Sequence, residues 1–108
     1  MSIIEWRVYL ALERLRLKYI YQYSIAGGHR LAGGQVIDFF VYTHPLPTPV
    51  YVQGDYWHGG NRSYETALKV AMANRLFRGR AMPVVELWEH ELSTDDAAYL
   101  VVKERLSQ

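Results

Sequence analysis

The sequence contains no cysteine, which excludes disulfide bonds and zinc sites built on thiolates. It has no apolar run near the ~18 residues that a membrane-spanning helix requires. Its first residues also lack the basic and apolar regions of a signal peptide. Internal repeats, linkers and low-complexity stretches are absent as well. We therefore expect a cytoplasmic protein that folds without covalent cross-links.

An excess of one charge is also missing, because twelve lysines and arginines face eleven acidic residues and the net charge is +1. A nucleic-acid partner would therefore depend on cations that cluster in space. Two stretches are locally basic: Arg14, Arg16 and Lys18, and Arg75, Arg78 and Arg80. These stretches fit a DNA-binding surface and two ordinary solvated faces equally well.

Hydrophobic residues, by contrast, are plentiful. They make up 50% of the chain, and 14% of the residues are aromatic, a composition that favours a packed core over disorder. A chain of 108 residues has room for one such core and not for two. We expect residues 1–108 to form a single domain.

The hydrophobic spacing predicts three helices. Residues 2–17 place apolar side chains on one face, and Ser2 with Glu5 forms a capping box at their start. Residues 63–78 return to the same spacing. A final helix follows Ser93, which is expected to be its N-cap.

Strands are predicted for four stretches rich in aromatic and β-branched residues: 19–25, 36–42, 50–54 and 83–88. A glycine-bracketed loop with His29 and Arg30 joins the first two, as in a hairpin. Prolines at 45, 47 and 49 impose a turn before the third. The order is α-β-β-β-α-β-α, which predicts an α/β (α+β) fold with a mixed sheet of about four strands flanked by helices.

Asp38 is the first candidate functional residue. It lies in a strand that is apolar on both sides of it, in the segment VIDFFV. A carboxylate buried there costs several kcal/mol unless it is paired, hydrogen-bonded or bound to metal. Strict alternation leaves the alternative that Asp38 points away from Ile37 and Phe39, toward solvent.

The second candidate is the segment QGDYWHGG, which follows the third strand and contains Gln53, Asp55 and His58. Strand ends that open into glycine loops are common positions for functional residues. Oxygen and imidazole ligands together suit Mg²⁺, Mn²⁺ or Zn²⁺. Strand pairing would bring Asp38 close to this segment, and we expect the side chains of Asp38 and Gln53 to face one cleft.

Three segments together, VIDFFV, VYVQGDYWHGG and PVVELWEHEL, resemble the very-short-patch-repair endonucleases. They resemble equally the related homing endonucleases and small phage proteins of the PD-(D/E)XK nuclease superfamily. The resemblance covers nearly the whole chain, including the helix-first order. It implies a restriction-endonuclease-like fold and a magnesium- or manganese-dependent DNA endonuclease.

The resemblance also implies roles for individual residues. Asp38 would bind the catalytic metal together with the backbone carbonyl near Val52. His58 would assist proton transfer or contact the leaving group, and Gln53 would orient water or phosphate. Glu5 of the first helix would support the metal or its waters, a role that competes with its place in the capping box.

The chain departs from the family pattern at one important position. Many relatives carry a glutamate two residues before the position of Gln53, where this chain has Tyr51. The patch-repair branch also lacks a carboxylate there, and Asp55 would supply the missing charge from the loop. The structural zinc site of that branch needs cysteines, so mismatch specificity does not carry over.

Other polar and aromatic residues have simpler interpretations. His29 and Arg30 contact phosphate or are solvated, and Trp57 is a packed aromatic more often than a base-stacking one. His90 lies between Glu89 and Glu91, but successive strand residues face opposite ways, which favours the surface over a metal cluster. No nucleophilic triad is visible.

The leading hypothesis is hydrolysis of a DNA phosphodiester by metal-activated water, with a homodimer or a partner protein supplying specificity. The alternative is a catalytically degenerate nuclease fold that binds nucleic acid or a protein, which Tyr51 favours. A structure-specific resolvase is a third possibility, since the superfamily contains such enzymes.

Overall fold

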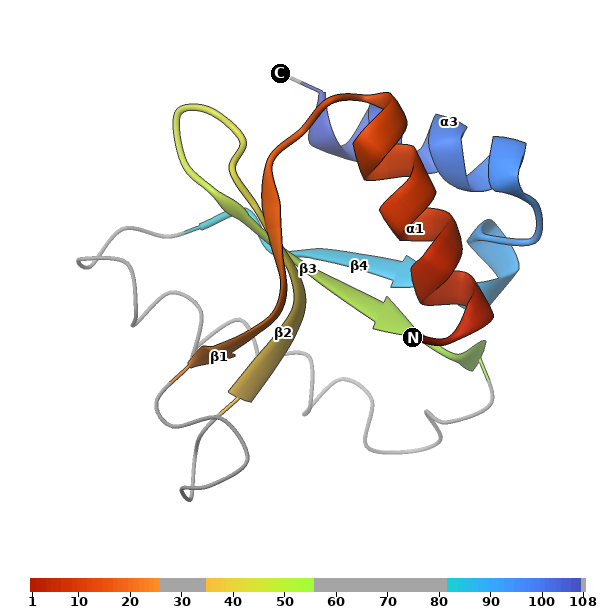
Figure 1. The fold of residues 1–108 in the computed structure, drawn as a ribbon, viewed down its shortest axis with the longest axis horizontal. Coiled ribbons are helices and arrows are strands. Elements are labelled where there is room, and N and C mark those ends of the chain that lie inside the picture. The colour runs from red at the N-terminus through yellow and green to blue at the C-terminus, as the bar shows by residue number, and fades with distance from the viewer. Residues whose placement is uncertain (26–34, 56–81, 108) are drawn as a thin grey trace.

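The computed structural model describes residues 1–25, 35–55 and 82–107 (Figure 1). The described elements are α1 (Ile3–Arg14), β1 (Tyr19–Ile25), β2 (Gln35–Val41), β3 (Thr48–Gln53), β4 (Val85–Trp88), the 3₁₀ helix η3 (Glu89–Glu91) and α3 (Asp95–Leu106). Neither α1 nor α3 is long and apolar enough to cross a membrane. The expected helix at 63–78 and the loop with His29 and Arg30 lie outside the described residues.

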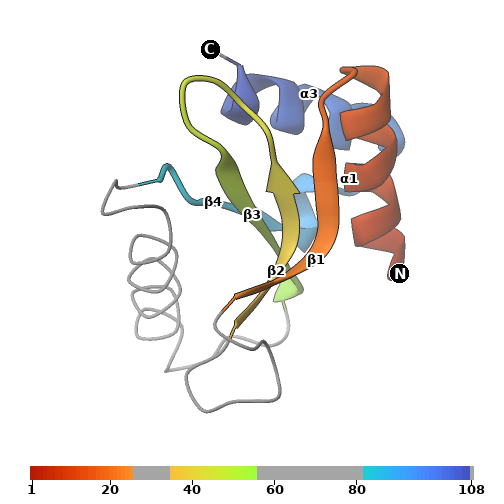
Figure 2. The ribbon, with the colours of Figure 1, turned by 60° about the vertical axis from the view of Figure 1, so that its left-hand side comes forward.

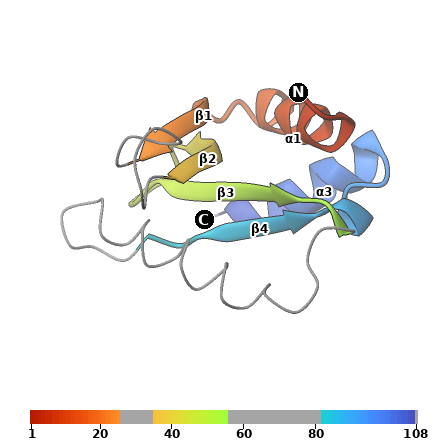
Figure 3. The same cartoon turned by 90° about the horizontal axis from the view of Figure 1, so that it is seen from below.

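The four strands form one mixed sheet in the order β1-β2-β3-β4. The pairs β1–β2 and β2–β3 are antiparallel, whereas β3 and β4 are parallel. Figures 1 and 2 show α1 and α3 side by side on one face of this sheet. Viewed from below, β3 and β4 run alongside each other (Figure 3). The expected mixed sheet of about four strands is confirmed.

Helix α1 begins as predicted. The hydroxyl of Ser2 accepts a hydrogen bond from the backbone N–H of Glu5, and the Glu5 carboxylate accepts one from the N–H of Ser2. The helix ends earlier than expected, at Arg14, with Leu15 as its C-cap. Arg16 then adopts a left-handed backbone with a φ of 58°, which a continuing helix excludes.

Helix α3 begins one residue later than predicted, because its N-cap is Thr94 and not Ser93. The Thr94 hydroxyl accepts a hydrogen bond from the N–H of Ala97 at 3.0 Å. Both hydroxyl residues are good caps by type, so the sequence alone left the choice between neighbours open. Asp95 and Asp96 occupy the first turn, where their negative charges interact favourably with the positive end of the helix dipole.

Strand β3 begins before the predicted position and includes Pro49. The turn imposed by the prolines is therefore shorter than expected, and Pro49 pairs with Phe40 of β2. The parallel pairing with β4 begins only at Val50, opposite Val85. Proline lacks the N–H that a ladder needs, and at this position it precedes the β4 ladder.

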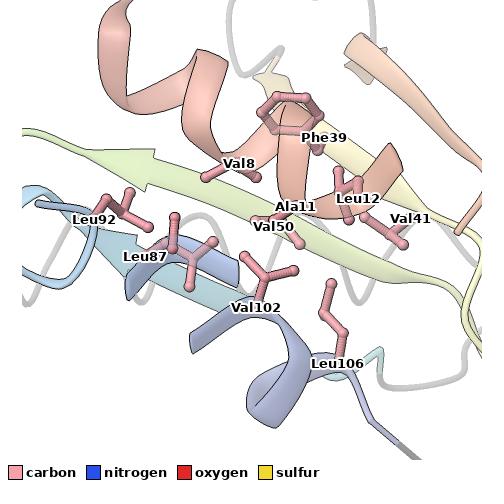
Figure 4. Packing of buried hydrophobic residues seen from close by; sticks show 11 residues of the cluster. Val8, Ala11, Leu12, Phe39, Val41, Val50, Leu87, Leu92, Val102 and Leu106 are labelled. Carbon is pink, nitrogen blue, oxygen red and sulfur yellow. The ribbon is translucent and has the colours of Figure 1, made fainter. Parts of the chain in front are cut away.

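The main core fills the space between the sheet and the two helices. Figure 4 shows its side chains converging from α1, β2, β3, β4 and α3. The buried members are Val8, Ala11, Leu12, Phe39, Val41, Val50, Leu87, Leu92, Ala98, Val102 and Leu106. Burial of a single large apolar side chain contributes about 1.5–3 kcal/mol, so this cluster fixes the helices on the sheet.

A second, smaller cluster consists of Ile37, Phe40, Tyr51 and Met82. It lies on the other face of the sheet, because Tyr51 follows Val50 in β3 and successive strand residues point to opposite faces. Strand β2 is therefore buried on both faces, as the apolar sequence around Asp38 predicted.

The alternation of β2 changes at Asp38. Phe39 belongs to the main core, whereas Ile37, two residues earlier, belongs to the second cluster. Regular alternation would place these two side chains on one face. Opposite this point in β1, Gln22 has a φ of 55°, a left-handed conformation that is rare for residues other than glycine.

The same change is visible in the tyrosines of β1. The ring of Tyr21 lies 5.2 Å from that of Phe39 in the main core. Tyr23, two residues later, instead stacks on Phe40 at 4.6 Å, on the other face. In both strands the regular alternation of side chains between the two faces is therefore interrupted at the level of Asp38. The Asp38 side chain lies on the face that the helices cover, as does Phe39.

Candidate functional site

A hollow of about 450 Å³ lies where the start of α1 meets the end of β3. Its walls are the N-cap Ser2 with the first residues of α1, Asp38 of β2, Val52 of β3, Gly54 just after β3, and Glu89 of η3. The hollow therefore combines the half-buried carboxylate in β2 with the carboxyl end of a strand, which is where open sheets commonly bind ligands.

Asp38 is held in this hollow by the neighbouring strand. The backbone N–H of Val52 donates to Asp38 Oδ2 at 2.7 Å. The β2–β3 ladder has its last pair at Phe39 and Val50, and beyond this pair the two strands diverge in Figure 1. Asp38 thus takes a backbone donor that the ladder no longer uses, and this bond fixes the orientation of the carboxylate.

Glu5 also lines the hollow, and it is part of the helix cap as well. Its Oε1 accepts from the N–H of Ser2 at 2.9 Å, and its Oε2 accepts from the hydroxyl of Tyr21 at 3.2 Å. Burial and the charges of Glu5 and Asp38 raise the pKa of Tyr21 above its usual value. The structure therefore brings Glu5 and Asp38 into one electrostatic environment.

Gln53 occupies a different position from the one expected. It lies on the strand next to Asp38, as predicted, and is 8% exposed. However, Val52 packs against the main core, so alternation assigns the Gln53 side chain to the Tyr51 face. Gln53 is not among the residues that line the hollow. Its role with water or phosphate stays a prediction that this geometry does not support.

Asp55 lies beyond the end of β3 and contacts a residue that the sequence interpretation assigned to the surface. Its Oδ1 is 2.7 Å from Nδ1 of His90, and its backbone N–H donates to Oε1 of Glu89 at 3.2 Å. Asp55 does not line the hollow, so its expected role as a metal ligand is not supported here.

The Asp55–His90 pair was missed because its partners are distant in the sequence. Gln53 and Trp88 are register partners in the parallel pair, and Asp55 and His90 each follow two residues later. Only the pairing of β3 with β4 reveals this, although both residues stand directly after predicted strands. His58 and Trp57 lie outside the described residues, and their roles stay predictions.

The oxygen atoms at the hollow suit an ion that keeps several of its waters, such as magnesium, better than an ion held by four protein ligands. Among residues 1–25, 35–55 and 82–107, no three His, Cys, Asp or Glu side chains form a group that could hold a metal. A closed four-ligand cage is therefore not formed by the described part. Magnesium commonly takes one or two carboxylates and keeps several waters, and Asp38 and Glu5, with the backbone of Val52, fit that pattern.

The basic stretch Arg14, Arg16 and Lys18 lies at the last residue of α1 and just beyond it. Arg14 lies 3.8 Å above the ring of Tyr99 and pairs with Asp96 at 3.8 Å. Lys103 approaches the same ring at 5.7 Å. Arg16 and Lys18 are exposed. The cluster at 75–80 lies outside the described residues, so the described part contributes one basic surface, partly neutralised by Asp96.

The chain matches no protein-family model, no curated protein and no solved structure. The likeness to the patch-repair endonucleases therefore rests on the sequence segments VIDFFV, VYVQGDYWHGG and PVVELWEHEL. What the protein does has to be argued from the geometry of its own residues.

Proposed function

We propose that this protein is a metal-dependent DNA endonuclease whose site is the hollow at Asp38. The observation that carries the proposal is the carboxylate itself. Asp38 interrupts a strand that is buried on both faces, and its side chain is fixed by the N–H of Val52 toward a hollow that Glu5 shares.

A structural role alone is a poor explanation for Asp38. Replacement of a buried ionic group by a well-packed apolar one is often neutral or stabilising. Its neighbours in the strand, Ile37 and Phe39, are apolar and fully buried. The carboxylate between them therefore favours ligand binding over a role in core packing.

In this proposal some residues of the hollow would bind the metal ion, and others would hold those ligands in place. Asp38 and Glu5, with the backbone near Val52, would hold Mg²⁺ or Mn²⁺, together with waters and a substrate oxygen. When bound, such an ion polarises the phosphoryl oxygen and lowers the pKa of the attacking water. The Val52 N–H keeps the Asp38 carboxylate in place, and Tyr21 and Ser2 do the same for Glu5.

DNA is the substrate that the resemblance implies, and the exposed cations at the end of α1 offer a complementary surface for its backbone. Specificity in this proposal comes from a second copy of the chain or from a partner protein. The cysteine-free composition favours the reducing cytoplasm.

The test is nicking of supercoiled plasmid by the purified protein with magnesium or manganese. Wild type should nick, Asp38→Asn should lose nearly all activity, and calorimetry should show that the variant has lost most of its metal affinity. Asp96→Asn is the matched control, because Asp96 is an exposed aspartate in the first turn of α3. Equal nicking by wild type and Asp38→Asn would assign the activity to another site.

One observation favours a second candidate, a nuclease fold that binds DNA or a protein without cleaving. Both oxygens of Glu5 already accept hydrogen bonds, and Tyr51, 1% exposed, occupies the position where many relatives carry a carboxylate. DNA binding without nicking, and without measurable metal binding in the presence of DNA, would establish this alternative.

A further inference from the structure

The parallel pair β3–β4 ends in a histidine–aspartate pair that the proposed function has not used. His90 Nδ1 and Asp55 Oδ1 are 2.7 Å apart, a short distance that fits a hydrogen bond to a charged group. When the carboxylate is ionised it only accepts, and Nδ1 is then the donor of this bond. The other ring nitrogen, Nε2, then points away from Asp55.

The pair stands at the rim of the hollow. Gly54 and Glu89 line the hollow, and Asp55 and His90 are the residues that directly follow them. Glu89 also ties the two segments together, because its Oε1 accepts the N–H of Asp55 at 3.2 Å. The Asp55–His90 pair therefore adjoins two residues that line the hollow.

The turn that carries His90 is anchored on its other side. Glu91 accepts the N–H of Trp88 at 3.1 Å and pairs with the guanidinium of Arg105. Arg105 in turn donates to the carbonyl of Glu86 at 2.9 Å. The backbone of η3 is thus fixed to β4 and α3, whereas the ring of His90 itself is 66% exposed and open to solvent and ligands.

We propose that His90, oriented by Asp55, is the general acid that protonates the leaving oxygen during phosphodiester hydrolysis at the hollow. This inference rests on the proposed function. A carboxylate behind Nδ1 fixes the ring and stabilises the imidazolium, while Nε2–H faces the substrate. His90 is the catalytic residue in this scheme, and Asp55 is a positioning residue.

The step balances without a further reactant. The oxygen of water forms a bond to phosphorus, and the bond from phosphorus to one ester oxygen breaks. That oxygen leaves with the electron pair and takes the proton from Nε2 of His90. The proton released by the attacking water passes to solvent, and the neutral imidazole regains a proton from solvent, to which its ring is exposed.

Plasmid nicking by His90→Ala, with and without added imidazole, tests the inference. Loss of a positioned acid should lower the nicking rate by roughly 10²–10⁴, and free imidazole should restore part of it, because the vacated position is open to solvent. Asp55→Asn should lose less, and Asp55→Glu should recover more than Asp55→Asn. The control is His44→Ala, an exposed histidine beyond the opposite end of β3, which should nick at the wild-type rate.

The outcomes separate this inference from the proposed function. If wild type nicks and His90→Ala nicks equally well, His90 is not the acid, although the endonuclease proposal stands. A loss that imidazole does not relieve, in a variant whose circular dichroism is native, assigns His90 a structural role and also overturns the inference. His90→Gln replaces His90→Ala if the alanine variant does not fold. No nicking by wild type, with no metal bound, overturns both proposals.

Discussion

The two ends of the described domain differ in chemistry more than in shape. Near the start of β3, a hollow of about 520 Å³ lies between the β2–β3 turn and the end of α3. Its lining includes Pro45, Leu46 and Leu106, and the hydroxyl of Thr43 already bonds to the carbonyl of Leu46. Near the end of β3, the hollow of about 450 Å³ contains carboxylates from three elements.

Volume therefore does not separate the two hollows, which differ in the polar groups that line them. The larger hollow is a gap between a proline-rich turn and a helix end, and its polar atoms include hydroxyls that bond to each other. The smaller hollow contains Asp38, whose Oδ2 accepts a hydrogen bond from the N–H of Val52. The basic stretch Arg14, Arg16 and Lys18 lies near the larger hollow, where the carbonyl of Lys18 accepts the N–H of Tyr42.

The largest expected effect contrasts His58, whose role is implied by the sequence resemblance, with His44 in the turn before β3. His58→Ala should retain metal binding and lower the nicking rate by roughly 10²–10⁴, the usual contribution of a positioned acid or base. His44→Ala, in the turn before β3, should leave the rate unchanged. Single-turnover nicking under saturating metal measures both. Equal rates for the two variants would remove His58 from the mechanism and leave His90 as the candidate acid.

A second test compares two glutamates of α1 that each accept a hydrogen bond from a tyrosine of β1. Glu5 accepts from Tyr21 at the hollow that contains Asp38, and Glu13 accepts from Tyr19 at 2.8 Å near the basic residue Arg14. Glu5→Gln should lower metal affinity or nicking about 10- to 100-fold, the usual effect of losing a supporting group. Glu13→Gln should not change either quantity.

Stability provides the control for that comparison. Each glutamate substitution should lower the free energy of unfolding by about 1 kcal/mol or less, because each replaces a charged hydrogen-bond acceptor by a neutral amide oxygen. Urea denaturation measures this value. If Glu5→Gln loses stability but retains full activity, its role is confined to the helix cap.

The negative charge of Asp38 should also change the free energy of unfolding at high pH, through its effect on the pKa of Tyr51. Burial, then the charges of Asp38 and Glu86, raise the pKa of Tyr51 from 10.0 to about 12. Between these values the unfolded chain releases the proton and the folded chain keeps it. The contribution of this group to stability is therefore complete below pH 10 and is lost as the pH rises toward about 12.

Urea denaturation between pH 9 and pH 12 measures that loss. Tyr51→Phe should make the decline in the free energy of unfolding less steep than in wild type. Asp38→Asn should make the decline smaller, because one negative charge that raises the pKa of Tyr51 is gone. Tyr19 and Tyr21 also have raised pKa values and supply a common background. An unchanged decline in Tyr51→Phe would mean that other groups govern alkaline unfolding.

The smallest effect concerns the basic end. If exposed cations there contact the DNA backbone, log–log plots of affinity against salt should become shallower by about one unit for each cation removed. Arg16→Gln and Lys18→Gln are suitable because both residues are exposed. Fluorescence anisotropy with a labelled duplex measures the slope. A wild-type slope near zero would exclude a backbone-binding surface at this end.

Much of the fold could be predicted because local physical rules determine it. The capping box at Ser2 and Glu5 and the strand at 19–25 were both predicted and are confirmed. The errors lie at element ends, at the cap of α3 and at Pro49 in β3. In each case neighbouring residues have similar local preferences for a cap or a strand end. The packing of the helix or strand against the rest of the fold then determines which residue takes that position.

The candidate site could be predicted only in part. The sequence alone identified Asp38 as anomalous, because a carboxylate in a strand with apolar residues on both sides conflicts with burial. It also placed Glu5 in the first turn of a helix, where the side chains of Glu5 and Ser2 each accept the other residue's backbone N–H.

Tertiary structure decided which polar groups meet. The left-handed Gln22 and the exchange of faces at Asp38 bring that carboxylate to the side of α1, beside Glu5. The alternation of β3 turns Gln53 away, and the parallel register of β3 with β4 joins Asp55 to His90. These contacts depend on strand register, and a shift of one residue reverses every side chain. A single sequence carries no local signal for that register, so only the folded chain determines it.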